Sequence, residues 1–502
     1  MLNDYTVLDF TDDRGEIGPM LLGDLGADVI RVELPGGSAA RESKPSVSAG
    51  KIGMQSLQYL SFNRNKRSIL LDPASKEDQK TLRQLIERAD FIFESAPSKT
   101  LTAYGLGYAE AQQLNPRIVY TLISPFGDDG PYAEFLGNDL VLAAMGGPVA
   151  LQGHPEREPI RVSVPQVWRH AGVEAASAAM AAHAKMLASG EPQFVDVSAQ
   201  CVMTWTMLNA MSAHAIQGFD FERLGSQVNN GMITIEIIHP TLDGYIVAIP
   251  TSPVILGCLE WMIQDGIVDQ SFRDIDWNDY DVNTPFPGEG PMDLQDALEF
   301  LRRFFACHRK EELFEFGLKQ GITLAPVNTL DELLALEHMR DRDYWQDLKL
   351  NETLSVEAPG LWAKPSNSSL SIRRSAPELN QHGNEIKKEL ETPAEPKEFP
   401  AMKGEDILPF DGIQVADFSW VGVGPISAKY LADHGATVTR IESESRPDVL
   451  RIGGPHKDGE PGLNRSQFFG NFNTSKQSIT LNLKTPQALE IVKKIISESD
   501  VM

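Results

Sequence analysis

The chain has 502 residues, of which 42% are hydrophobic and 23% charged, and its formal net charge is −25. This length and balance suit a globular protein of about three domains with a sizeable core. The excess of acid disfavours a nucleic-acid partner, because phosphate backbones repel an acidic surface. The cysteines are too widely spaced for a metal-binding or disulfide pattern, which suits a reducing compartment: Cys201, Cys258 and Cys307.

The apolar segments do not predict insertion into a membrane. The N-terminus lacks a signal-peptide pattern. The closest candidate for a span, 171–187, is interrupted by Glu174, His183 and Lys185. We therefore expect a cytoplasmic protein without a membrane partner.

The first 200 residues alternate between short apolar runs and helical patterns, which predicts an α/β fold with a parallel, doubly wound sheet. Apolar runs predict strands over 5–10, 26–33, 90–93, 117–123 and 194–197. Helices are expected between them at 76–88 and in an alanine-rich segment from about 169 to 188, ended by Gly190.

From about residue 225 the pattern changes to a smaller α+β module. Two strands are expected at 233–238 and 244–249, joined at the hairpin signal Asp243-Gly244. An acidic, Pro/Gly-rich loop and several helices complete the module: a helix with Cys258, the loop 273–294, helices at 295–306 and 310–320, and a helix opened by the capping box Thr329 to Glu332.

One segment occurs twice. Gly26–Glu33 corresponds to Gly435–Glu442, and in both a glycine ends a helical stretch before an apolar strand that closes with an acid. Matches continue on both sides with an offset that drifts only from 408 to 410: Asp9/Asp417, Asn63/Asn473, Lys66/Lys476, Ser68/Ser478, Ile69/Ile479, Leu71/Leu481 and Asp90/Asp500. So long a period indicates two tandem copies of one domain rather than a solenoid.

The repeat and the changes in composition set the expected boundaries. Copy one comprises a large domain over 1–224, an inserted small domain over 225–339 and a return to the large domain over 340–383. A Glu/Lys/Pro-rich linker over 384–407 leads to copy two, 408–502, the beginning of a second large domain. Because copy two halts inside the counterpart of the strand at 90–93, we expect the sequence to be a fragment of a longer protein.

The glycine pattern does not fit a dinucleotide-binding fold. Copy one has no G-x-G-x-x-G after its first strand. Copy two offers only Gly422-Val423-Gly424-Pro425, in which the proline removes a donor from a phosphate cradle. A nicotinamide-dependent oxidoreductase is therefore disfavoured, and a fluorescence titration with NAD would test it.

Several motifs taken together resemble the family III CoA-transferases, which include formyl-CoA transferase, carnitine CoA-transferase and α-methylacyl-CoA racemase. The matching segments follow one another along the chain: 7–11, 25–33, 65–72, 106–108, 115–120, 126–131 and 172–196. The resemblance covers both copies apart from the linker. It implies a Rossmann-like large domain with an inserted small domain. It also implies interlocked dimers, so that the protein is either a homodimer or a pseudo-dimer within one full-length tandem chain.

The resemblance further implies CoA transfer between an acyl-CoA and a carboxylic acid, with CoA as a substrate, no cofactor and no metal. The family nucleophile is an aspartate that carries CoA as a thioester. It lies four residues before the glycine that opens the alanine-rich helix. That glycine is Gly172 here, and the residue four before it is Trp168. No catalytic residue is therefore expected in copy one, and the nucleophile is expected in copy two beyond residue 502.

Copy one departs from the family elsewhere too. A His-Asp pair of the racemase branch is replaced by Asn138-Asp139, and His170 is expected to be a structural hydrogen-bonding group. The family segment Glu-Asn-Phe-x-Pro-Gly, which frames CoA, reads Glu94 to Lys99 here without the Asn and Phe, and Ala74 stands where a lysine is expected. Copy one is therefore expected to be a degenerate structural half.

Copy two is closer to the family at the nucleotide end. Val421, Gly422 and Val423 occupy the place of the backbone segment that meets the adenine side of CoA, and Leu481 and Lys484 occupy the places of the residues that flank the nucleotide. A lysine there would complement the CoA phosphates. The alternative for Lys484 is a solvated residue at a helix start.

Two other functions remain open. A non-catalytic acyl-CoA-binding or scaffold protein would follow if copy two were degenerate as well. An acyl-CoA racemase or epimerase is disfavoured by Asn138. The acyl substrate and its acceptor are not predictable from one sequence.

Overall fold

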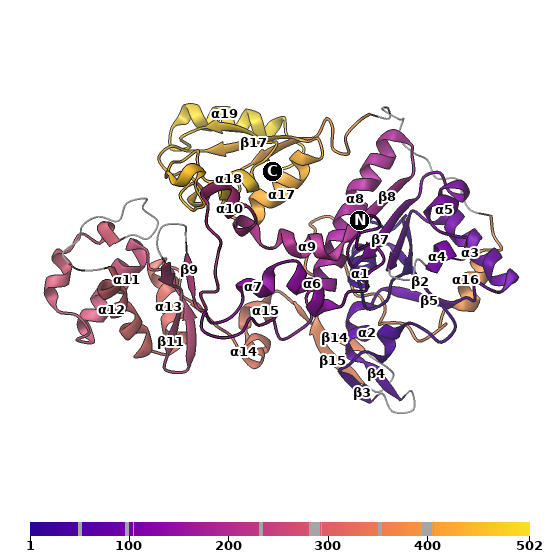
Figure 1. Ribbon diagram of the computed structural model, residues 1–502, viewed down its shortest axis with the longest axis horizontal. Helices are drawn as coiled ribbons and strands as arrows, with labels where there is room; N and C mark the ends of the chain where they lie inside the picture. The colour runs from indigo at the N-terminus through magenta and orange to yellow at the C-terminus, as the bar shows by residue number, and fades with distance from the viewer. Residues whose placement is uncertain are drawn as a thin grey trace. The chain divides into compact units, whose positions relative to one another are not determined.

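The computed structural model describes residues 1–48, 53–95, 100–103, 105–229, 234–280, 292, 294–349, 354–393, 404 and 406–502 (Figure 1). The chain forms two compact units. Unit 1 comprises Met1–Pro148, Arg161–Thr206 and Leu336–Gly412, and unit 2 comprises Val149–Ile160, Met207–Ala335 and Ile413–Met502. Unit 2 thus holds both the expected small domain and the segment expected as copy two. The domain boundaries of the sequence analysis stay a prediction.

Unit 1 is built on a parallel sheet with the order β5-β2-β1-β6-β7-β8. Its strands are β1 (Thr6–Phe10), β2 (Asp28–Glu33), β5 (Lys66–Leu70), β6 (Phe91–Ser95), β7 (Val119–Ser124) and β8 (Gln193–Ser198). The order reverses between β1 and β6, as in doubly wound folds. The α/β class and the parallel sheet expected from the sequence are confirmed.

Helices cover both faces of this sheet (Figure 1). One face packs against α1 (Ile17–Asp24) and α8 (Val167–Ser189) in a core that includes Val7, Phe91 and Phe93. The other packs against α3 (Lys76–Arg88), α5 (Tyr108–Leu114) and α16 (Gly383–Glu389). The inward residues alternate along each strand, because successive side chains of a strand point to opposite faces.

Two glycines allow α1 and α8 to approach closely. A Cβ at Gly18 would lie 2.7 Å from the carbonyl oxygen of Gly172, and a Cβ at Gly172 would lie 2.5 Å from Ile17 Cγ2. Both distances are shorter than any real carbon contact, so neither position accepts a side chain without moving a helix. Gly172 therefore fixes where the first turn of α8 lies against α1.

The remaining elements of unit 1 are short. Two antiparallel pairs, β3 with β4 and β14 with β15, flank the sheet. Their bounds and those of the other helices are β3 (Ser46–Ser48), β4 (Met54–Ser56), α2 (Leu57–Phe62), α4 (Thr100–Ala103), α6 (Asp139–Met145), α9 (Ala199–Trp205), α15 (Glu337–Asp341), β14 (Trp345–Lys349) and β15 (Ser355–Pro359); α7 (Pro148–Leu151) crosses into unit 2.

The expected linker over 384–407 is partly wrong as an extended segment. α16 occupies its beginning, and Arg67 holds this helix through ion pairs to Glu385 at 3.2 Å and to Glu389 at 2.8 Å. Ile386 and Leu390 enter the core of unit 1. The Glu- and Lys-rich composition that suggested a linker is thus the outer face of a docked helix, while 394–403 and 405 lie outside the described residues.

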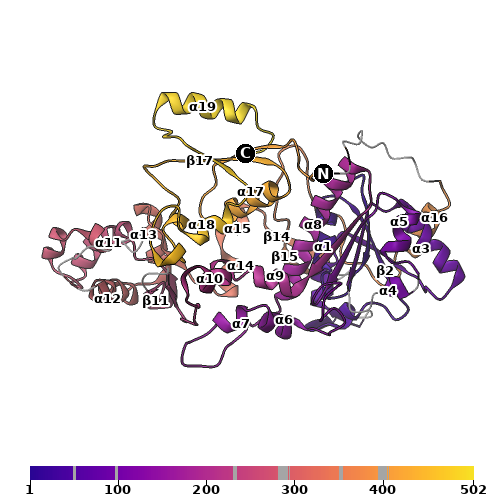
Figure 2. The same cartoon turned by 45° about the horizontal axis from the view of Figure 1, so that its top comes forward.

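In unit 2, residues 413–502 form a smaller parallel sheet with the order β16-β17-β18. The strands are β16 (Gln414–Asp417), β17 (Thr437–Glu442) and β18 (Gln477–Thr480), and the helices are α17 (Val423–Asp433), α18 (Gln467–Phe472) and α19 (Pro486–Ser497). α17 and α19 lie on opposite sides of β17 (Figure 2). This order matches β1-β2-β5 of unit 1.

The small module has its own core around Ile255, Cys258 and Phe304. Its elements are β9 (Gln227–Asn229), β10 (Thr234–Glu236), β11 (Ile238–Thr241), β12 (Gly244–Val247), α11 (Ser252–Gln264), α12 (Leu294–Ala306), α13 (Lys310–Gln320), β13 (Ala325–Pro326) and α14 (Leu330–Ala335); α10 (Ala213–Gln217) lies instead beside residues 457–459 of the copy-two segment. The hairpin at Asp243-Gly244 and the capping box of Thr329 and Glu332 are both present. The first expected strand instead splits into β10 and β11, and Ile233 lies outside the described residues.

Candidate functional site

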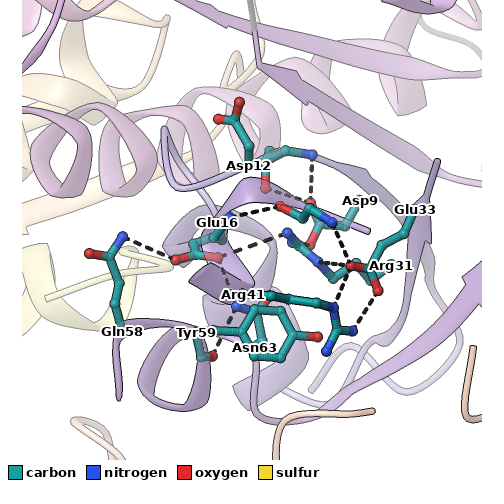
Figure 3. Close-up of polar contacts among 12 residues, drawn as sticks. Asp9, Asp12, Glu16, Arg31, Glu33, Arg41, Gln58, Tyr59 and Asn63 are labelled. Carbon is teal, nitrogen blue, oxygen red and sulfur yellow. Dashed lines mark hydrogen bonds and ion pairs between the residues drawn. The ribbon is translucent and has the colours of Figure 1, made fainter. Parts of the chain in front are cut away.

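A buried cluster of charges lies beneath the carboxyl edge of the unit 1 sheet (Figure 3). Asp9 at the end of β1 receives Lys66 Nζ at 2.8 Å and Arg31 Nη1 at 3.0 Å, and all three side chains are fully buried. Burial alone would raise the pKa of Asp9, but the charges of Lys66 and Arg31 outweigh it and lower that pKa. Lys66 also donates to Asn63 Oδ1 and to the Glu16 carbonyl oxygen, so this cluster ties β1, β2, β5 and the start of α1 together.

The same cluster recurs in copy two. Lys476 Nζ lies 2.9 Å from Asp417 Oδ2, 3.0 Å from Asn473 Oδ1 and 2.9 Å from the Pro425 carbonyl oxygen. Arg440 Nη1 lies 3.5 Å from Asp417. These contacts equate Lys66 with Lys476 and Glu16 with Pro425, which agrees with the register of the sequence repeat.

The third carboxylate of the cluster differs between the copies. In copy one it is Glu16, which lies 3.9 Å from Arg31 and whose pKa is raised by burial. In copy two the equivalent residue is Pro425, and Asp448 takes over the role with a contact of 2.5 Å to Arg440 Nη2. A buried guanidinium needs acidic partners, so the loss of one carboxylate is compensated from another loop.

Each copy also pairs the acid that ends its second strand with an arginine. Arg41 binds Glu33 through two hydrogen bonds of 2.7 and 2.6 Å, and Arg451 binds Glu442 through two of 2.8 and 3.0 Å. These pairs are not among the expectations from the sequence. A signal existed, because an arginine follows the strand-ending acid by eight residues in copy one and by nine in copy two.

The loop that follows the first strand is acidic in copy one and neutral in copy two. After β1, copy one has Asp12, Asp13 and Arg14, with Arg14 paired to Asp12. Burial, followed by the charge of Asp12, raises the pKa of Asp13. This loop is acidic and its one arginine is already paired, so it is poorly suited to phosphate.

After β16, copy two has the neutral segment that was predicted to meet CoA. Val421 is 42% exposed and Val423 83% exposed, at the first turn of α17. Gly422 is the N-cap residue and makes no side-chain capping bond. Val421 has a φ of +61°, which is costly for a β-branched residue and marks a loop held in a special conformation.

Leu481 and Lys484 follow β18 at the same edge of this sheet, since the carboxyl ends of parallel strands lie together. Leu481 is partly buried against Ala416 and Ile441, and its amide donates to the Glu442 carbonyl oxygen at 2.8 Å. Lys484 is exposed just before α19. The topology therefore places all five predicted binding residues of copy two at one edge, with β17 between the two groups, but CoA contact by them stays a prediction.

In copy one, the residue at the expected nucleophile position belongs to the core. Trp168 is 7% exposed and packs in the core that holds α8 against the sheet. Its neighbour His170 is exposed, and Glu174 is half-buried, with its pKa raised by burial. Neither side chain takes the buried place of Trp168.

Asn138 and Asp139 have structural roles in copy one. The Asn138 side chain caps α6 by accepting from Val141 N at 3.0 Å. Asp139 Oδ1 accepts from the amides of Gln166 and Val167 at 2.8 Å each, so it caps the start of α8. At the other expected nucleotide position, Glu94 is buried and accepts from Tyr120 Oη at 2.5 Å, while Ala96–Lys99 lie outside the described residues.

The family model for "CoA-transferase family III" matches residues 2–383 and 410–502. The chain belongs to this family. The match in two separate stretches omits the segment between 383 and 410. The relatives reported below are named CoA-transferases, and CoA is the group that such enzymes transfer.

Characterised family III relatives include the BbsE subunit of succinyl-CoA:(R)-benzylsuccinate CoA-transferase from Thauera aromatica, with 30% identity over 78% of this chain and 96% of that protein. Succinate–glutarate CoA-transferase from Agrobacterium fabrum is 27% identical over 74% of this chain and 91% of its own length. A probable CoA-transferase of Mycobacterium tuberculosis, Rv1866, aligns with 96% of this chain at 25% identity, and the aligned region spans 58% of that protein.

Among solved structures, a CAIB/BAIF family protein from Brucella suis aligns with a TM-score of 0.65 at 24% identity, over 77% of this chain and 98% of its own. This likeness concerns the fold. In the part of the family III chain described above, no cluster of three or more His, Cys, Asp or Glu side chains could hold a metal ion. None of the helices described is both long and apolar enough to cross a bilayer.

Proposed function

We propose that this protein moves CoA between an acyl-CoA and a free carboxylic acid through an aspartyl-CoA thioester. An aspartate carboxylate attacks the acyl thioester, which forms a mixed anhydride and releases the CoA thiolate. The thiolate then attacks the aspartyl carbonyl carbon, which gives aspartyl-CoA and frees the first carboxylic acid. The acceptor carboxylate repeats both steps in reverse order and leaves as the new acyl-CoA.

The observation that carries this proposal is the contrast between the two carboxyl edges. The segment Val421 to Val423 of copy two contains no acid of its own, although the Val421 amide donates to Asp448 Oδ2 at 3.2 Å, and Lys484 lies at the same edge. The start of α17 offers the backbone amides of Val423 and Gly424, but not of Pro425, and helix starts favour anions such as phosphate. Copy one presents Asp12 and Asp13 at the same place, which repel phosphate. We infer that copy two holds CoA and that copy one is a structural half.

The nucleophile follows from the same contrast. Trp168 in the core of copy one cannot attack a thioester, and no neighbouring carboxylate occupies its place. The aspartate that the sequence analysis expects in copy two beyond residue 502 is therefore part of this proposal. A pseudo-dimer of the two copies, or a homodimer, would complete the site.

The relatives suggest the substrates. Several are named for succinyl-CoA and for a second, dicarboxylic acid such as benzylsuccinate, glutarate or mesaconate. We propose succinyl-CoA as the CoA donor and a dicarboxylic acid as the acceptor.

The test combines exchange and trapping. The protein is incubated with succinyl-CoA and each of several dicarboxylic acids, new thioesters are followed by mass spectrometry, and intact mass is measured after hydroxylamine or borohydride. New acyl-CoA together with one modified aspartate would support the proposal. Modification within residues 1–224 would refute the degenerate first half, and CoA binding without exchange or modification would favour the non-catalytic scaffold.

A further inference from the structure

The carboxyl edge of copy two has an arginine that pairs with no acid among the described residues. Arg446 follows β17 by four residues and is exposed. Its amide donates to the Ser443 carbonyl oxygen at 3.1 Å, so a tight turn keeps it at the edge of the sheet. Its guanidinium carbon lies 4.2 Å from the ring centroid of Trp420, which follows β16 on the neighbouring strand.

The neighbouring arginines of this edge are already engaged by carboxylates. Arg440 contacts Asp417, Glu442 and Asp448, and Arg451 binds Glu442 through two hydrogen bonds. Among the residues that the structure describes, no carboxylate lies within ion-pair distance of Arg446. A guanidinium stacked on an aromatic face keeps its edge N–H groups available, in the fork geometry that suits phosphate.

Copy one also contains an arginine stacked on an aromatic ring, but there the guanidinium is already bound by a carboxylate. The Arg41 guanidinium carbon lies 4.1 Å from the Tyr59 ring centroid. Its edge, however, is occupied by Glu33 and by the Pro377 carbonyl oxygen. Three of the five N–H groups of Arg41 thus already have acceptors within the protein, and two of these bonds go to a carboxylate that Arg446 lacks among the described residues.

We propose that Arg446, positioned by Trp420, binds a phosphate of the CoA nucleotide and makes copy two selective for CoA over the unphosphorylated pantetheine thioester. The assignment rests on the proposed function and adds a specificity-determining residue to it. Lys484 follows β18, the strand next to β17, so the two cations follow adjacent strands, and the neutral loop 421–423 follows β16 on the other side of β17. The occupant is therefore expected to carry phosphate that both cations can reach at this edge.

Calorimetric titration of the 502-residue chain with CoA, dephospho-CoA and pantetheine tests the assignment. Arg446→Ala is expected to weaken CoA binding by about tenfold to hundredfold, the usual effect of removing a charged hydrogen bond, and to leave pantetheine binding unchanged. Arg446→Lys should restore part of the loss. If Arg446→Ala weakens the binding of dephospho-CoA as much as that of CoA, Arg446 binds the diphosphate. If it leaves dephospho-CoA binding unchanged, Arg446 binds the 3′-phosphate. Either result supports the proposal.

The matched control is Arg340→Ala, which removes an exposed arginine of unit 1 that is paired with Glu357. It should bind CoA as the unaltered chain does. If Arg446→Ala also binds CoA normally, or weakens CoA and pantetheine equally, the assignment is overturned while the proposed function stands. If the unaltered chain binds no CoA, the proposed function fails and this assignment fails with it.

Discussion

The two Rossmann-like halves of this chain bury the same charges but expose different ones. Asp9, Arg31 and Lys66 in copy one correspond to Asp417, Arg440 and Lys476 in copy two, and both lysines contact the same set of atoms. The loops above these clusters share an arginine paired with the acid that ends the second strand, but they differ at the segment after the first strand, where copy one has Asp12 and Asp13 and copy two has Val421 to Val423. The buried cluster is therefore a requirement of the fold, because it joins three strands and a helix start, whereas the chemistry of the site lies in the loops.

The largest expected effect comes from placing an acid at the lost nucleophile position. Trp168→Asp removes a large core side chain and buries a carboxylate without a partner, so we expect the free energy of unfolding to fall by about 3–5 kcal/mol. We expect no gain of CoA transfer. Urea unfolding and the exchange assay with succinyl-CoA measure the two quantities. Trp168→Phe, which keeps an aromatic core residue, should cost far less, and transfer by Trp168→Asp would show that copy one retains a working frame.

The next effect compares the two buried lysines. Lys66→Met leaves the fully buried Asp9 with Arg31 and with the amide and hydroxyl of Thr11, and we expect the free energy of unfolding to fall by about 3–5 kcal/mol. Lys476→Met should cost less, because Lys476 is less deeply buried than Lys66, while Asp417 keeps the matching donors of Ser419. Urea unfolding read by pulsed hydrogen exchange resolves the two segments. Equal losses would contradict the view that the copy-one cluster is the more tightly enclosed.

Lowering the pH should change the stability of the two copies by different amounts. Four carboxylates have pKa values that burial alone would raise but that their cationic partners lower: Asp9, Glu33, Asp417 and Glu442. Their stabilisation is complete above the ordinary pKa values near 4 and is lost as the pH falls through the lowered values. Glu16 has the opposite sign, because its raised pKa costs stability at neutral pH and protonation relieves that cost.

Since copy two has Pro425 in place of Glu16, its segment should lose more stability on acidification, by about 1 kcal/mol. Urea unfolding between pH 3 and 7, followed by a hydrogen-exchange pulse at one fixed pH, measures this difference. In Glu16→Gln, copy one should show the steeper loss expected of copy two. A steeper loss in unaltered copy one than in copy two would mean that Glu16 is not strained as its burial suggests.

The smallest effect tests a feature that the copies share. Ser75 caps α3 by accepting from Asp78 N, and Thr485 caps α19 by accepting from Ala488 N, both at 3.4 Å. Ser75→Ala and Thr485→Ala should each cost about 1 kcal/mol, since each leaves one helix amide without its acceptor. The same urea experiment reads both. If the two losses in the free energy of unfolding differ by more than the experimental scatter, α3 and α19 contribute unequally to the stability of their copies.

The fold was predictable where the signal is local. Strand periodicity located β1, β2, β6 and β7, and the repeat aligned Lys66 with Lys476 and Asp9 with Asp417, although it did not predict that each lysine contacts its aspartate. α16 was missed because its charged outer face resembles a linker, and only its two core residues, Ile386 and Leu390, distinguish it.

The site was less predictable. The sequence identified Trp168 as the wrong residue for a nucleophile, yet it did not show that Asn138 and Asp139 cap helices, because those partners depend on the packing of α6 and α8. Asp448 was also missed, since it acts for a residue that lies 23 positions earlier in the chain, at Pro425. Compensation between distant loops leaves no periodic trace.

The contact between Gly18 and Gly172 has a practical consequence for engineering. This contact sets the distance between α8 and α1, because the two backbones touch and neither position tolerates a methyl group. Arg169 and His170, which lie outside the core, can therefore be randomised in a library while the helix axis stays where it is, whereas Trp168 and Ala171 pack in the core. A search for variants in which copy one transfers CoA should hold these two glycines constant and vary only positions in the turn that precedes Gly172.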